Sequence, residues 1–418
     1  MFALVAMMAP VFGAVSLLPL DPSQLDRIRY LSLPVILTEL LVLAYCLRHR
    51  GLLFATAARL PKFVQIGLAL WTAVAVLSAS NAEGSRPTAV YFTFCAVTHV
   101  AFGLAVFSLF EGPWRSRQAA FLKMMMAGMA ACFALLVAYV AIRGGEPGFS
   151  WLALGFLGNN VRHVGYFSAA GAALALGWFA AEGRSFPRWP GLILAVLMAS
   201  VGYWSGTRFM LAGLIGSAIL ACLIFRGSSL RRLSFGLIFT LIAAIPISLL
   251  HQPPWGSYGF WRIIGTSAGG NAAAGFSNNR WDLWLRTADQ IRQNPWIGHG
   301  EAQLPYLHIT PQFIETHPHN VALQFMFHYG VAGGLLALIL LTWGVLAAHR
   351  NAVRQPSLGL PAWMGLVSLL LISLIDGSLY WPYPTAMCAL LLGYLISLEG
   401  PELSIRPGQE PDDPRRAQ

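Results

Sequence analysis

The sequence is built from apolar runs of about twenty residues that alternate with short polar segments. A helix that crosses a membrane needs about 20 mostly apolar residues, because it rises 1.5 Å per residue through a hydrocarbon core about 30 Å thick. About twelve runs meet this requirement. They lie near 2–20, 30–47, 63–80, 88–110, 120–142, 164–181, 190–205, 207–225, 233–250, 321–347, 361–377 and 381–398. The pattern predicts an all-α polytopic membrane protein with about 12 transmembrane helices.

The charge content excludes a soluble fold. Of the 418 residues, 56% are hydrophobic and only 11% are charged. Soluble domains carry about 25% charged residues, so too few are present here to cover a soluble surface. All five cysteines fall inside apolar runs, and we therefore expect neither a disulfide framework nor a thiolate metal site.

The distribution of the 27 Lys and Arg residues predicts which side of the membrane each loop faces. Seventeen of the 27 lie in one alternating set of connections and in the C-terminal tail, and the rest are spread over the longer loops of the other set. The positive-inside rule places the richer set in the cytoplasm, together with both termini. This distribution accounts for the net charge of +10 without a nucleic-acid partner. The N-terminal run lacks a basic n-region, so we expect it to be the first span and not a signal peptide.

The predicted organisation has four parts. Residues 1–250 contain nine transmembrane helices, 251–320 form a large periplasmic loop, 321–398 contain three more spans, and 399–418 form a disordered cytoplasmic tail. Within the loop, apolar residues recur at helical spacing from about 279 to 293, namely Trp281, Trp284, Leu285, Ala288 and Ile291. We expect an amphipathic helix on the membrane surface, with its Trp face toward the headgroups, that ends at Asn294-Pro295.

Three arginines on the predicted outer side indicate an anion site. Arg208 ends a very short turn between two spans, Arg162 precedes a span, and Arg280 begins the amphipathic helix. A guanidinium stays charged and matches phosphate oxygens in a bidentate manner. The three side chains could converge on a diphosphate at the outer leaflet. The alternative is that each anchors its helix to lipid headgroups.

A histidine cluster on the same side indicates acid–base chemistry. The segment His317-Pro318-His319-Asn320 precedes the tenth span, and His163 follows Arg162. Histidine titrates near neutral pH and can accept a proton from a hydroxyl group. A zinc site would need a third ligand, for which His299 and Glu315 are the candidates, but no tight ligand spacing supports it. The third alternative is a purely structural histidine.

Three other ionisable residues lie in or near predicted spans. Glu39 and His99 lie within spans, and Asp376 lies near the outer end of another. We expect Glu39 and His99 to be helix–helix partners or cavity-lining groups.

Several of these residues carry a resemblance to a known family. The segment from Asn279-Arg280-Trp281-x-x-Trp284 through Asn294-Pro295-Trp296-x-Gly298-x-Gly300 resembles the large periplasmic loop of the O-antigen ligase and polymerase superfamily. His319-Asn320, nine further residues and then Gly330-x-x-Gly333 is similar to a signature of O-antigen ligases, and Arg208 is similar to an arginine of their short periplasmic turn. The resemblance covers about 155–335.

The resemblance implies a GT-C-like bacterial inner-membrane glycosyltransferase that needs no metal or other cofactor and has a periplasmic active site. The donor would be a glycan on undecaprenyl diphosphate, the acceptor lipid A–core oligosaccharide, and a single displacement would invert the anomeric centre. His319 would be the general base. Arg208 and Arg280 would bind the diphosphate with help from Arg162, and the supporting residues would be His317, Asn320, Trp284 and His163.

Two other functional classes remain open. Within the superfamily, an O-antigen polymerase or a protein O-oligosaccharyltransferase would use the same donor with another acceptor. A transporter for a lipid-linked sugar would place polar residues at the bilayer midplane in repeated, broken helices. Here the polar residues collect on one side and no repeat is found, so we favour the enzyme.

Overall fold

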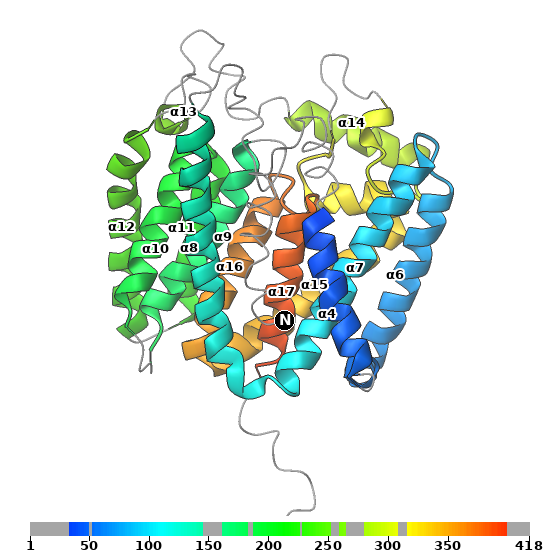
Figure 1. The fold of residues 1–418 in the computed structure, drawn as a ribbon. Helices are drawn as coiled ribbons and strands as arrows, with labels where there is room; N and C mark the ends of the chain where they lie inside the picture. The colour runs from blue at the N-terminus through cyan, green and yellow to red at the C-terminus, as the bar shows by residue number, and fades with distance from the viewer. Residues whose placement is uncertain are drawn as a thin grey trace, which may run out of the picture.

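The computed structural model describes residues 33–49, 52–144, 161–182, 187–225, 228–251, 259–264, 280–307 and 316–398. Within these ranges the regular structure is helical and no strand occurs. The long helices form one bundle, and the short helices α13 and α14 lie at the same end of it (Figure 1). The predicted first span at 2–20 and the predicted tail at 399–418 lie outside the described residues.

The helices follow the predicted apolar runs closely. The first group comprises α4 (Leu33–Arg48), α5 (Leu52–Ala57), α6 (Lys62–Ser80), α7 (Arg86–Glu111), η1 (Arg115–Arg117) and α8 (Gln118–Arg143). The second comprises α9 (Val161–Ala180), α10 (Trp189–Trp204), α11 (Arg208–Ile224), α12 (Ser228–Leu249) and α13 (Phe260–Ile264). The third comprises α14 (Arg280–Gln293), η3 (Leu304–Tyr306), α15 (Val321–Arg354), α16 (Pro356–Ser373) and α17 (Pro382–Ile396). Each predicted span from 30–47 onward coincides with one of these helices.

The length and composition of these helices fit a membrane protein. Among the described residues, 6 helices are long and apolar enough to cross a membrane, and further apolar helices are shorter. Large apolar side chains on the outside of the bundle are exposed, as on α6 (Ile66) and α12 (Ile242), where lipid would cover them. The total of about twelve spans remains a prediction.

Helix α9 lies at the centre of one half of the bundle. It packs against α10, α11, α12 and α16, and its described side chains are buried throughout. Small residues allow these close approaches: a Cβ atom at Gly177 would lie 2.8 Å from the Cα atom of Pro361 on α16. The alanine-rich sequence of α9 therefore reflects close helix packing.

Helix α15 is divided by a kink at Gly330. The backbone there has φ 71° and ψ 175°, a conformation that favours glycine. Loop residues after α14 bind the backbone at the kink. The amide N–H groups of His299 and Gly300 donate to the carbonyls of Phe327 (2.8 Å) and His328 (3.0 Å). The loop motif Gly298-x-Gly300 therefore packs against the start of the helix motif Gly330-x-x-Gly333. These contacts fix the segment 321–329 to the loop.

Helix α14 lies where the spacing predicts a helix, but its apolar residues point in two directions. Leu283 and Ile291 are buried and pack with Leu304 and Phe327. Trp281 is exposed. Ile291, which recurs with the Trp residues at helical spacing, therefore packs against the protein, and the orientation of the Trp face toward lipid headgroups stays a prediction.

Candidate functional site

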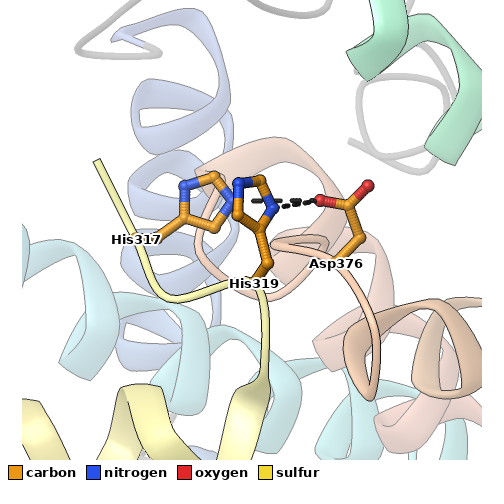
Figure 2. A group of neighbouring side chains, drawn as sticks. All are labelled: His317, His319 and Asp376. Atoms are coloured by element: carbon orange, nitrogen blue, oxygen red, sulfur yellow. Dashed lines mark hydrogen bonds and ion pairs between the residues drawn. The ribbon is translucent and has the colours of Figure 1, made fainter. Parts of the chain in front are cut away.

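The carboxylate of Asp376 is the centre of the site. Helix α16 ends at Ser373, so the predicted span 361–377 extends too far and Asp376 lies in the turn before α17. Nδ1 of His319 lies 2.6 Å from Oδ1 of Asp376. Figure 2 shows the imidazoles of His317 and His319 beside this carboxylate. His319 and Asp376 are 57 residues apart in the sequence and therefore come together only in the folded protein.

Arg280 brings a positive charge to the same carboxylate. Nη2 of Arg280 lies 3.4 Å from Oδ2 of Asp376, and Nη1 donates to the backbone carbonyl of Ile375. The guanidinium also covers the ring of Phe209, with Cζ 4.1 Å from the ring centroid. Its side chain is 15% exposed. Arg280 thus links α14 to the turn after α16 and to the first residues of α11.

The two histidines differ in exposure. The side chain of His317 is 5% exposed, whereas that of His319 is 22% exposed. His317 stacks on Tyr380, with ring centroids 4.7 Å apart, and its Nδ1 lies 2.8 Å from the Thr316 hydroxyl. His319 therefore has the better access to a substrate, and His317 forms the wall behind it.

Local backbone structure places His319. Its φ of 53° is in the left-handed region, which non-glycine residues seldom adopt outside functional or turn positions. Asn320 caps α15, because its Oδ1 accepts from the amides of Ala322 and Leu323 at 3.0 Å each. Its Nδ2 donates to Leu374 at 3.0 Å, so the cap also holds the turn that carries Asp376.

Trp284 supports the histidine segment from the other side. Its Nε1 donates to the carbonyl of Pro318 at 2.9 Å. Trp284 is one helical turn after Arg280, so the two side chains leave the same face of α14. That face therefore holds both the histidine segment and the Asp376 turn.

Arg208 lies next to this cluster. It begins α11, and its neighbour Phe209 contacts Arg280. Nε and Nη2 of Arg208 donate to the carbonyl of Arg262 at 3.2 and 2.9 Å, and Arg262 donates to the carbonyl of Gly206. The two arginines thereby join the short turn before α11 to α13.

Arg162 and His163 are placed only by their backbone. Both belong to the first turn of α9, and their side chains lie outside the described residues. The same turn packs against the short turn before α11, since a Cβ atom at Gly165 would overlap Thr207. The backbone of this turn is therefore close to the start of α11.

Electrostatics keep Asp376 ionised. Burial opposes ionisation, but the hydrogen bond from His319, the charge of Arg280 and the charges of the His319 and His317 imidazoles when they are protonated hold the pKa of Asp376 well below its usual range. When the imidazole of His319 is neutral, the charged carboxylate favours the N–H on Nδ1, and Nε2 is the basic nitrogen. The site thus combines a guanidinium, an ionised carboxylate and an imidazole whose Nδ1 faces that carboxylate.

Comparison with known families agrees with this geometry. Residues 193–338 match the family model described as O-antigen ligase. This match supports the resemblance of the segment to the O-antigen ligase superfamily. No curated protein matches the chain. The superfamily consists of glycosyltransferase-like enzymes, and the matched segment contains Arg208, Arg280 and His319.

Asp376 is the main residue of the site that sequence reasoning missed. It lies beyond the segment that matches the O-antigen ligase superfamily. Its place near the outer end of a span is evident from the sequence, but no role was predicted for it. The available signal was a carboxylate just after an apolar run on the side that also carries the arginines and histidines.

A metal ion is the alternative occupant of the cluster. His317, His319 and Asp376 offer ligand atoms that all lie within 4.8 Å of one another. The third group is therefore Asp376 and not His299, whose Nε2 lies 2.9 Å from the carbonyl of Gln290. Glu315, the other candidate, lies outside the described residues. Arg280 already pairs with Asp376 at 3.4 Å, so a divalent cation at the cluster would lie close to the positive charge of the guanidinium.

A mostly apolar cavity adjoins the cluster. It has a volume of about 260 Å³ and lies between α6, α7, α15 and α17. Tyr380 lines it and also stacks on His317, so the cavity reaches the back of the site. His99 also lines the cavity and pairs with Glu39 at 2.8 Å. The expected helix–helix partnership of Glu39 and His99 is thus present, and His99 is also a cavity-lining residue.

Proposed function

We propose that this protein transfers a glycan from undecaprenyl diphosphate to a hydroxyl of lipid A–core oligosaccharide at the periplasmic face of the bacterial inner membrane. The observation that carries the proposal is the contact of His319 and Arg280 with the same carboxylate of Asp376. It joins a candidate base to a candidate diphosphate ligand in a chain whose residues 193–338 match the O-antigen ligase family model. Residues 251–320 form the periplasmic loop in this proposal, and both termini are cytoplasmic.

His319 acts as the general base. Its Nε2 takes the proton from the acceptor hydroxyl, while Asp376 holds Nδ1 and stabilises the imidazolium that forms. The acceptor oxygen forms a bond to the anomeric carbon, and the bond from that carbon to the diphosphate oxygen breaks. Undecaprenyl diphosphate leaves with the bonding electron pair. One such displacement inverts the anomeric configuration, so a product with retained configuration would rule the scheme out.

The arginines stabilise the leaving diphosphate. Negative charge builds up on the leaving oxygen in the transition state, and fixed cations lower the energy of that state. Arg280 is held in place by Ile375 and Asp376, and Arg208 by the carbonyl of Arg262. Both guanidiniums are therefore oriented before the donor binds. Arg162 has a supporting role in the proposal, as does His163 next to it.

The diphosphate itself provides the activation that other transferases obtain from a nucleotide or a metal. A diphosphate is a good leaving group, so the reaction requires only a base and a cationic site. We therefore propose that no metal or other cofactor takes part. The apolar cavity beside Tyr380 offers a place within the bundle for part of the polyprenyl chain.

The test is transfer by the purified protein. The protein in detergent, with a lipid-linked glycan and lipid A–core acceptor, should form a product whose mass is the sum of glycan and acceptor. A lipid-linked sugar transporter would form no covalent product. A loss-of-function strain then separates the two main alternatives, because loss of a ligase leaves core without polymer, whereas loss of a polymerase leaves core with a single repeat unit.

A further inference from the structure

The carboxylate of Glu301 is buried at the junction between the large loop and the kink of α15. Its side chain is 10% exposed. One carboxylate oxygen accepts a hydrogen bond from the hydroxyl of Tyr329, and the other lies 2.8 Å from Nδ1 of His328. Both partners precede Gly330, so one acidic group holds the last turn of the segment 321–329. The proposed reaction does not use this carboxylate.

The backbone of the same turn is fixed to α6. The hydroxyl of Ser78 donates to the carbonyl of His328, which also accepts from Gly300. The ring of Trp71 packs edge-on against Tyr329, with centroids 5.7 Å apart. The side chains and the backbone of this turn are therefore held by two separate parts of the chain, α6 and the loop.

The position of Glu301 itself is also fixed. Nε2 of Gln303 donates to the carbonyl of Glu301 and to that of Ser85, at 3.0 Å each. Oε1 of Gln303 accepts from the amide of Ser85 at 2.8 Å. The loop segment that carries Glu301 is thereby tied to the connection between α6 and α7.

The segment 321–329 transmits this restraint to His319. Nine helical residues are about 13 Å long, so a tilt of roughly 5° at the kink moves the other end by about 1 Å. That end is the cap formed by Asn320, directly after His319. A displacement of about 1 Å in a catalytic group can lower the rate by about 100-fold. The contacts of Glu301 therefore bear on the distance between His319 and Asp376.

We propose that Glu301 is a positioning residue for the contact between His319 and Asp376. It acts by holding Tyr329 and His328, the last residues of the segment 321–329, whose other end follows His319. The kinetic part of this inference rests on the proposed function, whereas its structural part does not. Glu301 touches neither substrate nor the reacting groups in this proposal.

The informative variant is Glu301→Gln. It keeps the side-chain shape and an acceptor for Tyr329 but removes the charge that faces His328. We expect kcat to fall by about 10–100-fold, while KM for donor and acceptor and the melting temperature stay close to those of the wild type. Glu301→Asp, which restores the charge, should recover part of kcat. The matched control is Glu111→Gln, which removes the carboxylate of the last residue of α7, where it pairs with Arg59 at 2.9 Å, and should leave kcat unchanged.

A second measurement does not depend on turnover. Diethyl pyrocarbonate modifies unprotonated imidazoles, and peptide mass spectrometry reports the modification of His319 as a function of pH. In Glu301→Gln the midpoint should move to lower pH, because a more distant Asp376 favours the protonated ring less. A midpoint equal to that of the wild type would overturn the inference, whatever the transfer rate. A wild-type protein that makes no product would instead contradict the proposed function, and the modification result would still decide the role of Glu301.

Discussion

Nδ1 of His319 donates to Oδ1 of Asp376 across 2.6 Å, although 57 residues separate them in the chain. An ionised carboxylate at this distance selects the tautomer with the proton on Nδ1 and fixes the plane of the ring. In that tautomer the nitrogen without a proton is Nε2, on the opposite edge of the imidazole. In the proposed function this pair orients the ring for proton transfer before the substrate binds.

Replacing each histidine of the His317-Pro318-His319 segment should separate their roles. His319→Ala removes the base, and we expect kcat to fall by at least about 100-fold. His317→Ala removes a buried wall residue stacked on Tyr380, and we expect a loss of less than about tenfold. The measurement is initial rate with saturating donor and acceptor. Full activity of His319→Ala together with inactivity of His317→Ala would reverse the assignment.

Asp376→Asn should reveal the ionised carboxylate through the pH dependence of stability. The pKa of Asp376 in the folded protein lies below the usual value of an Asp carboxyl, which is about 4. The ionised carboxylate therefore stabilises the folded state fully above about pH 4, and this stabilisation is lost as the pH falls from about 4 toward the lowered pKa. The wild type should therefore melt at a higher temperature than the variant at pH 7, and the gap should narrow in acid. A gap that is constant between pH 7 and pH 3 would contradict the depressed pKa.

The sequence predicted much of the fold because lipid imposes a simple rule. An apolar run of about twenty residues must form a helix, since its backbone has no other hydrogen-bond partners in the bilayer. The run at 88–110 thus became α7 at Arg86–Glu111. Boundaries near the membrane surface were harder to predict. The run at 361–377 extends past the end of α16, because apolar residues such as Leu374 and Ile375 continue after the helix has ended.

The site could be predicted only in part. His319, Arg280 and Trp284 were found because their motifs resemble those of a family, and the structure brings all three together. The partnership with Asp376 was not accessible, because a contact across 57 residues leaves no trace in spacing or periodicity. The binding of Arg208 to the carbonyl of Arg262 was missed for the same reason: backbone acceptors have no sequence signature.

Arg280 should contribute to catalysis more through its geometry than through its charge alone. Arg280→Lys keeps one positive charge but loses the planar fork that binds Ile375 and Asp376 together. We expect kcat/KM for the donor to fall about 10-fold in Arg280→Lys and about 100–1,000-fold in Arg280→Ala. Arg286→Ala, which removes an exposed ion pair with Asp282 on the same helix, is the control and should change the rate little. Equal rates for the wild type and Arg280→Ala would remove Arg280 from the site.

The kink of α15 should be sensitive to a single methyl group. Gly330→Ala places a Cβ atom against the carbonyl of Trp296 in a left-handed conformation. With φ 71° and ψ 175° the backbone lies in a region open almost only to glycine, so the conformation alone costs about 1–3 kcal/mol, and the overlap adds to it. We expect a lower melting temperature and slower transfer. Gly344→Ala is the matched control on the same helix, because its Cβ would meet only Leu392 at an ordinary 3.8 Å. Equal melting temperatures for the two variants would show that the kink is not required.

The last prediction concerns metal. His317, His319 and Asp376 could ligate an ion. That ion would compete with both Arg280 and Nδ1 of His319 for the carboxylate of Asp376. Electrostatic repulsion between a divalent cation and the guanidinium opposes binding. Treatment with a chelator should therefore leave the transfer rate within about twofold of the untreated rate.

At a concentration high enough to overcome this repulsion, added zinc should act as an inhibitor. Bound at the cluster, it would withdraw His319 from proton transfer, and His317→Ala should weaken that inhibition by removing one of the three ligands. The measurement is the transfer rate against zinc concentration for both proteins after chelator treatment. Loss of activity in chelator that zinc, manganese or magnesium restores would replace the acid–base scheme with a metal-assisted one, because the groups now assigned as base and orienting carboxylate would then be ligands.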